Sequence, residues 1–359
     1  MISAWQCVSG RSGSDVISSR LVLSELREEA ELGFWMIWES TIYREDGPLL
    51  WTIAAVVAAL AIGTVVRIVA LRGAATDLVQ ARLSSLKTWW ILAVILSVAV
   101  ICRQTGVAIL LASVAILGLR EFVGLLGWSS VGRPSTVIVF AFVPAYYALL
   151  LLGNESLLRP AAPVAFLVAL GGLRASLGLV EGFIRTTAAL SWGLMLMVYC
   201  LSHAAMLLTL ESQHVPFVGR AGWFLFLILL TETNDIMQAI IGRRFGRTKI
   251  TPRVSPNKSL EGLLGGMTVT VAIAVVMAPW LTGLTAGRSM LAGVGVSLLA
   301  GVLISLFGFL GDINMSGVKR DVGVKDGSQL LPGQGGMIDR IDSLTFTAPI
   351  FYYFVRLVM

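Results

Sequence analysis

Long apolar runs separated by short polar breaks make up most of the chain after residue 48. Many approach the roughly 20 residues that a helix needs to cross the hydrocarbon core of a bilayer. They lie near 49–70, 89–102, 106–123, 135–152, 160–180, 187–210, 221–242, 260–281, 289–311 and 343–358. The pattern predicts an all-α polytopic membrane protein with about ten transmembrane helices. It leaves open whether the second and third runs, around Cys102–Gly106, form two short helices or one broken helix.

Residues 1–48 have a different character. A mixed-charge patch at 25–31 precedes the aromatic segment Phe34–Trp38. A secretory signal would have a basic start, an apolar core and a small-residue cleavage site, and this pattern is missing. An amphipathic segment at the membrane interface and a poorly ordered extension both fit, and we favour the extension. We therefore predict two parts: an N-terminal extension over 1–48 and a membrane-embedded domain over 49–359.

Basic residues gather in every second loop. The loop after the seventh run is the richest, and the intervening loops are poorer, with Arg103, Arg159, Arg220 and Arg288. Because cytoplasmic loops of membrane proteins carry an excess of Lys and Arg, the N-terminus is expected outside and the charge-rich loops in the cytoplasm. The expected location is the inner (cytoplasmic) membrane. The net charge of +6 is assigned to these loops, so nucleic acid is not an expected partner.

Composition narrows the class further. The chain is 56% hydrophobic and 13% charged, which excludes an ordinary soluble enzyme. Cys7, Cys102 and Cys200 form no CxxC pair, and the histidines are His203 and His214. A disulfide framework and a Cys/His metal centre are therefore not predicted. His203 is interpreted as a buried histidine inside a span, and Glu121 as the ion-pair partner of Arg120.

Charges are concentrated in one stretch near the C-terminus, Ser316–Ser343, which we call the signature stretch. It reads SGVKRDVGVKDGSQLLPGQGGMIDRIDS and follows Asp312, expected where a helix leaves the membrane. Carboxylates suit hard cations such as Mg²⁺, and Lys, Arg and glycine-exposed amides suit phosphate oxygens. Asp339 and Asp342 are three residues apart, so a helix would place both carboxylates on one face. Arg340, between them, would point elsewhere, with a phosphate as a candidate partner. The combination predicts a site for a metal-bound nucleotide or pyrophosphate.

A second charged stretch, Thr231–Gly266, contains Glu232 and Asp235, a basic run, and then Val-Ser-Pro-Asn-Lys-Ser. Pro256 is expected to stiffen a turn, Ser255 and Ser259 offer hydroxyl groups, and Lys258 offers a positive charge for a phosphate. An ordinary juxtamembrane basic loop that neutralises anionic headgroups is the alternative interpretation.

Together the two stretches resemble the motifs of phosphatidate cytidylyltransferases, also called CDP-diacylglycerol synthases. The signature residues are Ser316, Lys319-Arg320, Lys325-Asp326, Pro332-Gly333, Gly335-Gly336, Asp339-Arg340 and Asp342; the earlier block is Gly242, Gly246, Lys249, Val254, Ser255, Pro256, Lys258, Ser259, Glu261 and Gly262. One position departs, because Gln334 stands where the family usually has histidine.

The resemblance implies transfer of CMP from CTP to phosphatidate, giving CDP-diacylglycerol and pyrophosphate for phospholipid biosynthesis. It implies Mg²⁺ held by Asp312 and Asp339, with a second monovalent or divalent cation left open. The catalytic candidates are Lys319, Arg320, Lys325, Asp326, Arg340 and Asp342. The substrate-binding candidates are Ser255, Lys258, Ser259, Asp235, Ser316 and Gln334. The partners would be CTP, the lipid phosphate, the bilayer and, from the family, a second copy in a homodimer.

Two alternative functions and one structural interpretation stay open at this point. Glutamine at 334 can replace a hydrogen-bonding histidine but cannot replace one that transfers a proton. A related enzyme acting on a different lipid phosphate is therefore the nearest variant. A transporter or lipid-binding membrane protein without catalysis is the second, although transporter sites lie near mid-membrane rather than in loops on one side. The aspartates could also form a purely structural network with Lys319, Arg320 and Lys325.

Overall fold

The computed structural model describes residues 47–71, 76–210, 214–324, 327–328, 330–331 and 334–359. The chain divides into units of 1–51 and 52–359, and the first is described only at 47–51, where α2 begins. The predicted extension over 1–48 thus lies almost wholly outside the described residues. So do Lys325, Asp326, Pro332 and Gly333 of the signature stretch. The features below belong to the second unit.

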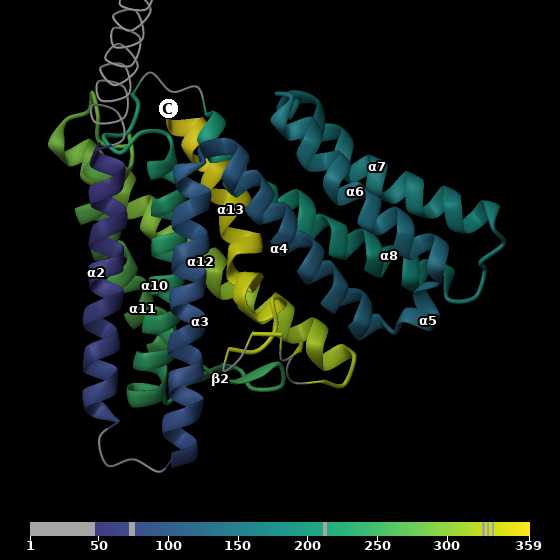
Figure 1. The fold of residues 1–359 in the computed structure, drawn as a ribbon, viewed down its shortest axis with the longest axis horizontal. Helices are drawn as coiled ribbons and strands as arrows, with labels where there is room; N and C mark the ends of the chain where they lie inside the picture. Colours follow the sequence, from purple (N-terminus) through teal and green to yellow (C-terminus); the bar gives the residue numbers. More distant parts are fainter. Residues whose placement is uncertain (1–46, 72–75, 211–213, 325–326, 329, 332–333) are drawn as a thin grey trace, which may run out of the picture. The chain divides into compact units, whose positions relative to one another are not determined.

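Helices dominate the described residues (Figure 1). They are α2 (Gly47–Ala70), α3 (Thr76–Ile101), α4 (Arg103–Leu126), α5 (Trp128–Val131), α6 (Arg133–Leu151), α7 (Glu155–Ser176), α8 (Phe183–Leu194), the π-helix η1 (Met195–Cys200), α9 (Leu201–Met206), the 3₁₀-helix η2 (Leu207–Thr209), α10 (Ala221–Phe245), α11 (Leu260–Leu281), α12 (Met290–Asp321) and α13 (Ile338–Val358). Strands β1 (Lys249–Thr251) and β2 (Ser255–Ser259) form an antiparallel hairpin.

The predicted all-α membrane protein is confirmed. Within the part of the chain that the structure describes, nine helices are long and apolar enough to cross a membrane. One of them is the continuous run from α8 to η2, Phe183–Thr209. The run predicted at 343–358 lies in α13, which is not among the nine. Since α13 packs against α4, α9, α10 and α12, protein covers much of its surface and a continuous apolar face is not required.

The second and third runs form two separate helices. Cys102 alone separates α3 from α4, and Arg103 has a φ of 54°, which breaks the helical path. Neither helix is short, because α3 has 26 residues and begins at Thr76, well before the predicted start near residue 89. Polar and charged residues such as Gln80 and Lys87 hid this first part of α3 from a search for apolar runs.

Helices α10 to α13 pack together closely and carry both charged stretches. At Gly311, a Cβ atom would lie 2.4 Å from the Asp342 carbonyl oxygen, so only glycine allows α12 to approach α13 this closely. At Gly262, a Cβ would lie 2.9 Å from the Gln238 carbonyl oxygen, which similarly fixes α10 against α11. These contacts place the end of α12, the start of α13 and the start of α11 close together.

A buried amide connects three of these helices. The Asn234 Oδ1 atom accepts hydrogen bonds from Ser305 Oγ at 2.6 Å, Gln238 Nε2 at 3.0 Å and Thr270 Oγ1 at 3.4 Å. These residues belong to α12, α10 and α11, and Asn234 is fully buried. Polar side chains between membrane helices commonly hydrogen-bond across the interface. Asn234 therefore fixes the register of the helices beneath the charged stretches.

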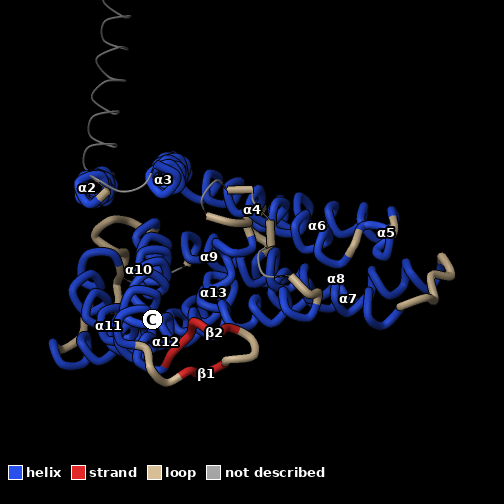
Figure 2. Tube along the Cα trace, turned by 90° about the horizontal axis from the view of Figure 1, so that it is seen from below, coloured by secondary structure: helices blue, strands red, loops and turns tan. Residues whose placement is uncertain are grey.

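Two segments predicted as loops are more ordered than expected. Ser316–Asp321 continue α12 and Ile338–Ser343 begin α13, so the signature stretch is two helix ends joined by residues 322–337. The segment around Pro256 forms the β1–β2 hairpin instead of a simple turn. Figure 2, seen from below, shows the hairpin beside α12. The Glu261 carboxylate stabilises the segment just before β1, because it accepts hydrogen bonds from the backbone N–H groups of Arg247 and Thr248 at 3.0 and 3.1 Å.

Candidate active site

The two charged stretches meet at a cavity of about 890 Å³, which we call the reaction cavity. It lies where the ends of α10, β2, α11, α12 and α13 converge, with α2 and α3 forming a further wall. Its lining includes eight predicted site residues: Asp235, Lys258, Ser259, Asp312, Gln334, Asp339, Arg340 and Asp342. The structure therefore brings together residues up to 107 positions apart in sequence, as the two-stretch interpretation required.

Both aspartates expected to bind metal are paired with lysines from other segments. Asp312 Oδ2 lies 2.6 Å from Lys258 Nζ, and Asp339 Oδ1 lies 2.6 Å from Lys319 Nζ. The four side chains are between 11% and 25% exposed, so water screens these pairs only partly. The network expected as a structural alternative is thus partly present, with Lys258 in addition to Lys319. Lys319 reaches Asp339 although it does not itself line the cavity.

Lys258 is positioned from two sides. Besides Asp312, it donates a hydrogen bond to Gln238 Oε1 at 3.4 Å, and Gln238 is in turn bound to Asn234. A line of polar contacts therefore runs from the helix interior through Gln238 to the ammonium group in the cavity. Gln238 was not among the predicted residues, because an uncharged glutamine in an apolar helix gives no distinctive signal in the sequence.

Asp339 organises the loop that precedes α13. Its Oδ2 atom accepts hydrogen bonds from the backbone N–H of Gly336 at 3.0 Å and of Gly327 at 3.4 Å. Together with Lys319, these contacts occupy both carboxylate oxygens. Asp339 and Asp342 line the same cavity, as their spacing predicted. Arg340 lines the cavity too, which is compatible with the expectation that its side chain serves a phosphate.

Glu121 on α4 is the most consequential residue that the sequence did not reveal. Its carboxylate accepts from the backbone N–H of Met337 at 2.8 Å and of Ile338 at 2.9 Å, and from Ser328 Oγ. Met337 is the N-cap of α13 and Ile338 is its first residue, and both are buried, so their N–H groups lie where the helix dipole stabilises a negative charge. The expected Arg120–Glu121 ion pair is not found among the described contacts. Glu121 and Met337 are 216 positions apart in the sequence, which explains why sequence reasoning missed the contact.

Gln334 attaches the signature stretch to α3. It is 9% exposed, and its Nε2 atom donates to the Ser85 carbonyl oxygen at 3.1 Å. Its Oε1 atom is buried without a hydrogen-bond partner among the described residues and belongs to a side chain that lines the cavity. A histidine could keep the donated hydrogen bond, so the structure is compatible with either residue at this position.

Three further predicted site residues do not line the reaction cavity, and a fourth lines it but uses its hydroxyl group to cap a helix. Arg320 is exposed and donates to the carbonyl oxygens of Val254 and Val324, away from the cavity lining. Ser255 pairs with Thr251 in the hairpin. Ser316 Oγ donates to Asp312 Oδ1 at 3.3 Å, so it touches the site indirectly. Ser259 lines the cavity, but its hydroxyl caps α11 by accepting from Gly262 N.

The donor atoms of the cavity fit a hard cation. Five carboxylates, Glu232, Asp235, Asp312, Asp339 and Asp342, line it with four cationic side chains, Arg67, Arg243, Lys258 and Arg340. No three His, Cys, Asp or Glu side chains within the described ranges are close enough to form a ready-made metal cage. Mg²⁺ commonly takes only one or two carboxylates and completes its shell with water and substrate phosphates. The buried Asp235 Oδ1 atom, which lacks a hydrogen-bond partner among the described residues, is a further available donor.

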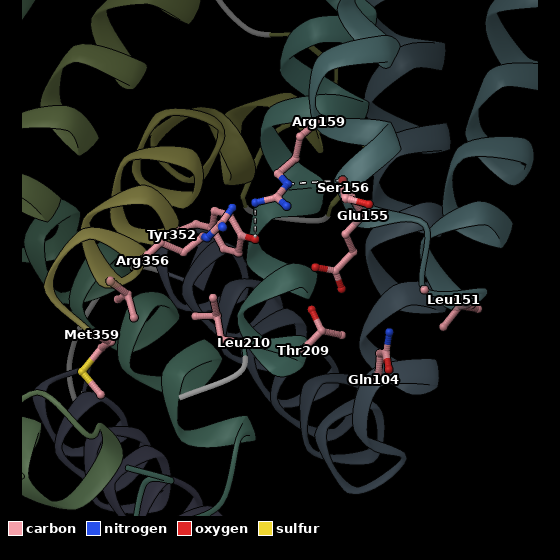
Figure 3. Close-up of a pocket in the computed structure, with 12 residues that line it drawn as sticks. Gln104, Leu151, Glu155, Ser156, Arg159, Thr209, Leu210, Tyr352, Arg356 and Met359 are labelled. Atoms are coloured by element: carbon pink, nitrogen blue, oxygen red, sulfur yellow. Dashed lines mark hydrogen bonds between the residues drawn. The ribbon is translucent and has the colours of Figure 1, made fainter. Parts of the chain in front are cut away.

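A second polar cavity, of about 540 Å³, contains none of the predicted site residues. It includes the C-terminal end of α13, opposite the end that carries Asp339. Figure 3 shows Arg159 directed toward Tyr352, while the Glu155 carboxylate is turned away from that guanidinium group. Residues of both charged stretches line the cavity at the other end of α13, and none of the predicted site residues lines this one.

Comparisons with known proteins agree with this assignment. The model of the Cytidylyltransferase family matches residues 83–358, well over half of the chain. The chain belongs to this family. It is also 39% identical over 271 residues to an uncharacterized protein of Escherichia coli K12 called YnbB, covering 76% of this chain and 86% of that protein. The resemblance seen in the two charged stretches is thereby confirmed at the level of the family.

Similarity to named enzymes is more local. The phosphatidate cytidylyltransferase of Haemophilus influenzae is 39% identical over 154 residues, 42% of this chain and 52% of the enzyme. That of Synechocystis is 42% identical over 132 residues, 35% of this chain and 40% of the enzyme. The chain thus matches about half or less of the length of these two enzymes.

Proposed function

We propose that the protein transfers CMP from CTP to a lipid phosphate, with phosphatidate as the acceptor. A phosphate oxygen of the lipid forms a bond to the α-phosphorus of CTP, and the bond between that phosphorus and the β-phosphate oxygen breaks. The products are CDP-diacylglycerol and pyrophosphate, and no redox partner is needed. The main support for this proposal is that the two charged stretches, which resemble the family's motifs, line one charged cavity at the ends of membrane helices.

The cavity suits a reaction that depends on bringing anions together. A lipid phosphate is already a charged nucleophile, so catalysis needs positioning and stabilisation of charge more than a strong general base. Lys258 and Arg340 would bind the phosphates of CTP, and Arg67, from the α2 wall, would face the acceptor phosphate. Before substrate binds, Lys319 holds Asp339 in place through their ion pair. The acyl chains would remain in the bilayer beside α2 and α3.

We propose Mg²⁺ as the cofactor, held by Asp312 and Asp339, with Asp235 and Asp342 as nearby oxygen donors. When bound, Mg²⁺ would neutralise charge on the triphosphate and on departing pyrophosphate. Both aspartates now contact lysines at 2.6 Å. Lys258 and Lys319 would therefore turn from the carboxylates to the substrate phosphates when cation and nucleotide enter together.

We further propose that the protein lies in the inner (cytoplasmic) membrane and that the reaction cavity opens on its cytoplasmic side. The support is the excess of Lys and Arg in the loops at this end, including the hairpin and signature stretch. CTP is made and used in that compartment, so the proposed orientation delivers the nucleotide to the cavity while the lipid enters from the bilayer.

A homodimer is proposed on the family resemblance alone. Light scattering after size-exclusion chromatography, with the detergent contribution subtracted, should give twice the 38.4 kDa of one chain. A protein mass of one chain at concentrations that support activity would contradict it.

The activity is tested by following pyrophosphate release from purified protein in detergent with CTP, phosphatidate and Mg²⁺, omitting each in turn. Release should require all three. Release with another lipid phosphate in place of phosphatidate would instead support the related enzyme with a different acceptor. Well-folded protein that releases no pyrophosphate with any of them would favour a non-catalytic lipid-binding or transport protein.

A further inference from the structure

A third cavity, of about 970 Å³, lies among the ends of α4, α5, α7 and α12 and the starts of α6 and α8. We call it the side cavity. Its lining includes Ser130, Arg174, Gly182, Arg185 and Asp321. Asp321 follows Lys319 and Arg320 at the end of α12. It belongs to the signature stretch, so the side cavity lies at the same end of α12 as that stretch. It shares no lining residue with the reaction cavity.

Arg174 supplies a buried positive charge to this cavity. The residue is 2% exposed, and its Nη atoms donate only to uncharged groups: Val131 O at 3.2 Å, Ser135 Oγ at 3.3 Å and Glu181 O at 3.5 Å. Its Nε atom is buried without a hydrogen-bond partner, and none of the ion pairs between described residues involves it. A buried guanidinium group is usually paired with an anion, so this charge lacks its expected partner.

Two helix N-termini face the same space. Gly132 precedes α6 and Gly182 precedes α8; both line the cavity, and neither helix start is capped by a side chain. The first-turn N–H groups of a helix have no intrahelical acceptor and carry the positive end of the helix dipole. In α8 the Phe183 N–H already donates to Val180 O, and Pro134 has no N–H, so the remaining donors are at Ile184 and Arg185 in α8 and at Arg133 and Ser135 in α6. A phosphate group at such a position is a common arrangement. The uncapped starts and the unpaired guanidinium group are independent features that favour the same kind of ligand.

The remaining charges are compatible with this preference. Arg185, in the first turn of α8, adds a second guanidinium group to the lining. The carboxylates in the lining belong to Glu181 and Asp321, and both residues are exposed. Water and salt screen exposed charges more strongly than the buried charge of Arg174.

We propose that the side cavity binds a phosphate group, separately from the reaction cavity and on the same face. Arg174 and Arg185 would offer fork-shaped donors to the phosphate oxygens, and the starts of α6 and α8 would offer backbone N–H groups. The phosphate group can belong to an anionic lipid at the membrane surface or to a small soluble molecule. Both sources present the same chemistry, and the experiment separates them.

Hydrogen–deuterium exchange of the purified full chain provides a local readout. Peptides over 183–187 report the first turn of α8, and peptides over 133–137 report that of α6. Two probes are compared: glycerol 3-phosphate added in detergent, and phosphatidate in phosphatidylcholine nanodiscs against phosphatidylcholine alone. A bound phosphate should slow exchange by about 1 + [L]/Kd, roughly tenfold when the probe is at ten times its Kd. Sodium chloride of equal ionic strength serves as the control for salt.

Matched arginine variants assign the protection to the cavity. Arg185→Gln removes a cavity charge from an exposed side chain and should abolish most of the protection at 183–187. Arg133→Gln removes the same charge from an exposed residue next to Gly132 that is not in the lining, and it should leave the protection intact. Arg174→Lys keeps the charge but removes the fork, so it should weaken protection in protein whose thermal unfolding shows that it is folded.

The source of the phosphate follows from which probe protects the helix starts. Protection by glycerol 3-phosphate without protection by phosphatidate nanodiscs supports a soluble ligand, and protection by phosphatidate nanodiscs, with or without glycerol 3-phosphate, supports a lipid headgroup. Unchanged exchange of the wild-type protein with both probes would overturn the proposal. Protection that survives Arg185→Gln to the same extent as Arg133→Gln would also overturn it, because the effect would then arise elsewhere.

Discussion

Glu121 shows how a single side chain can set the geometry of this site without lining the reaction cavity. It accepts from two backbone N–H groups at the start of α13, and two aspartates of the cavity, Asp339 and Asp342, follow within five residues. Each hydrogen bond to a charged group contributes about 1.5–3 kcal/mol. The direction of Asp339, and with it the Lys319 pair, thus depends on a carboxylate from α4.

Replacing Glu121 should therefore impair turnover more than a surface change would. Glu121→Gln keeps the shape but loses the charge, and losing about 1.5 kcal/mol of loop stabilisation corresponds to roughly tenfold lower activity. Glu121→Ala should lower it further. The measurement is CDP-lipid formation at saturating CTP, with thermal unfolding as a check of folding. Arg120→Gln, at the exposed neighbouring position, is the control, and equal activities of Glu121→Gln and Arg120→Gln would contradict this role.

Gln334 provides a second test at this scale. Because its Nε2 atom binds the Ser85 carbonyl oxygen, Gln334→Leu should release the signature stretch from α3 and raise the KM for CTP. Gln334→His can still donate and should stay within a few-fold of the parent protein. Steady-state kinetics of the two variants distinguishes anchoring from incidental packing. If Gln334→Leu behaves like the parent protein, the hydrogen bond has no part in substrate binding.

At the scale of elements, the close approach of α12 and α13 positions the two halves of the signature stretch. Asp312 belongs to α12, whereas Asp339 and Asp342 belong to α13, and the contact at Gly311 determines how far apart they lie. The hairpin adds Lys258 to the same place through its ion pair with Asp312. The site is thus built from three elements whose relative position depends on backbone packing.

Gly311→Ala should separate these helices. The added Cβ would lie 2.4 Å from the Asp342 carbonyl oxygen, and overpacking of this kind typically costs about 1–3 kcal/mol. Gly295→Ala in the same helix has nothing within 4 Å of the added atom, so it should be neutral or slightly stabilising. Thermal unfolding in detergent compares the two. A Tm for Gly311→Ala equal to that of Gly295→Ala would show that α12 and α13 are not in tight contact here.

For the molecule as a whole, the proposed function requires that the cavity opens to the cytoplasm. Single cysteines test this in a protein whose Cys7, Cys102 and Cys200 are replaced by serine. Arg253→Cys in the hairpin turn should react with a membrane-impermeant maleimide only after the membrane is disrupted. Val215→Cys, an exposed residue between η2 and α10, should react in intact cells. The reverse pattern would contradict the predicted orientation.

The sequence predicted the membrane architecture and most of the cavity because both depend on local patterns. Apolar runs located the spans, and motif spacing identified Lys258, Asp312 and Asp339. Contacts that depend on tertiary packing leave no such pattern in the sequence. Glu121 and Gln238 lie in helices whose sequences resemble ordinary membrane spans, so their contacts with the site could not be predicted.

The central claim is that the reaction cavity transfers CMP to a lipid phosphate, and the fate of labelled CTP tests it most directly. Purified protein is given phosphatidate, Mg²⁺ and CTP labelled at the α-phosphate or, separately, at the γ-phosphate. We predict that the α label appears in the lipid and the γ label in pyrophosphate, and that Asp312→Ala abolishes both. The α label remaining in free CMP, or no turnover by folded protein, would contradict the account.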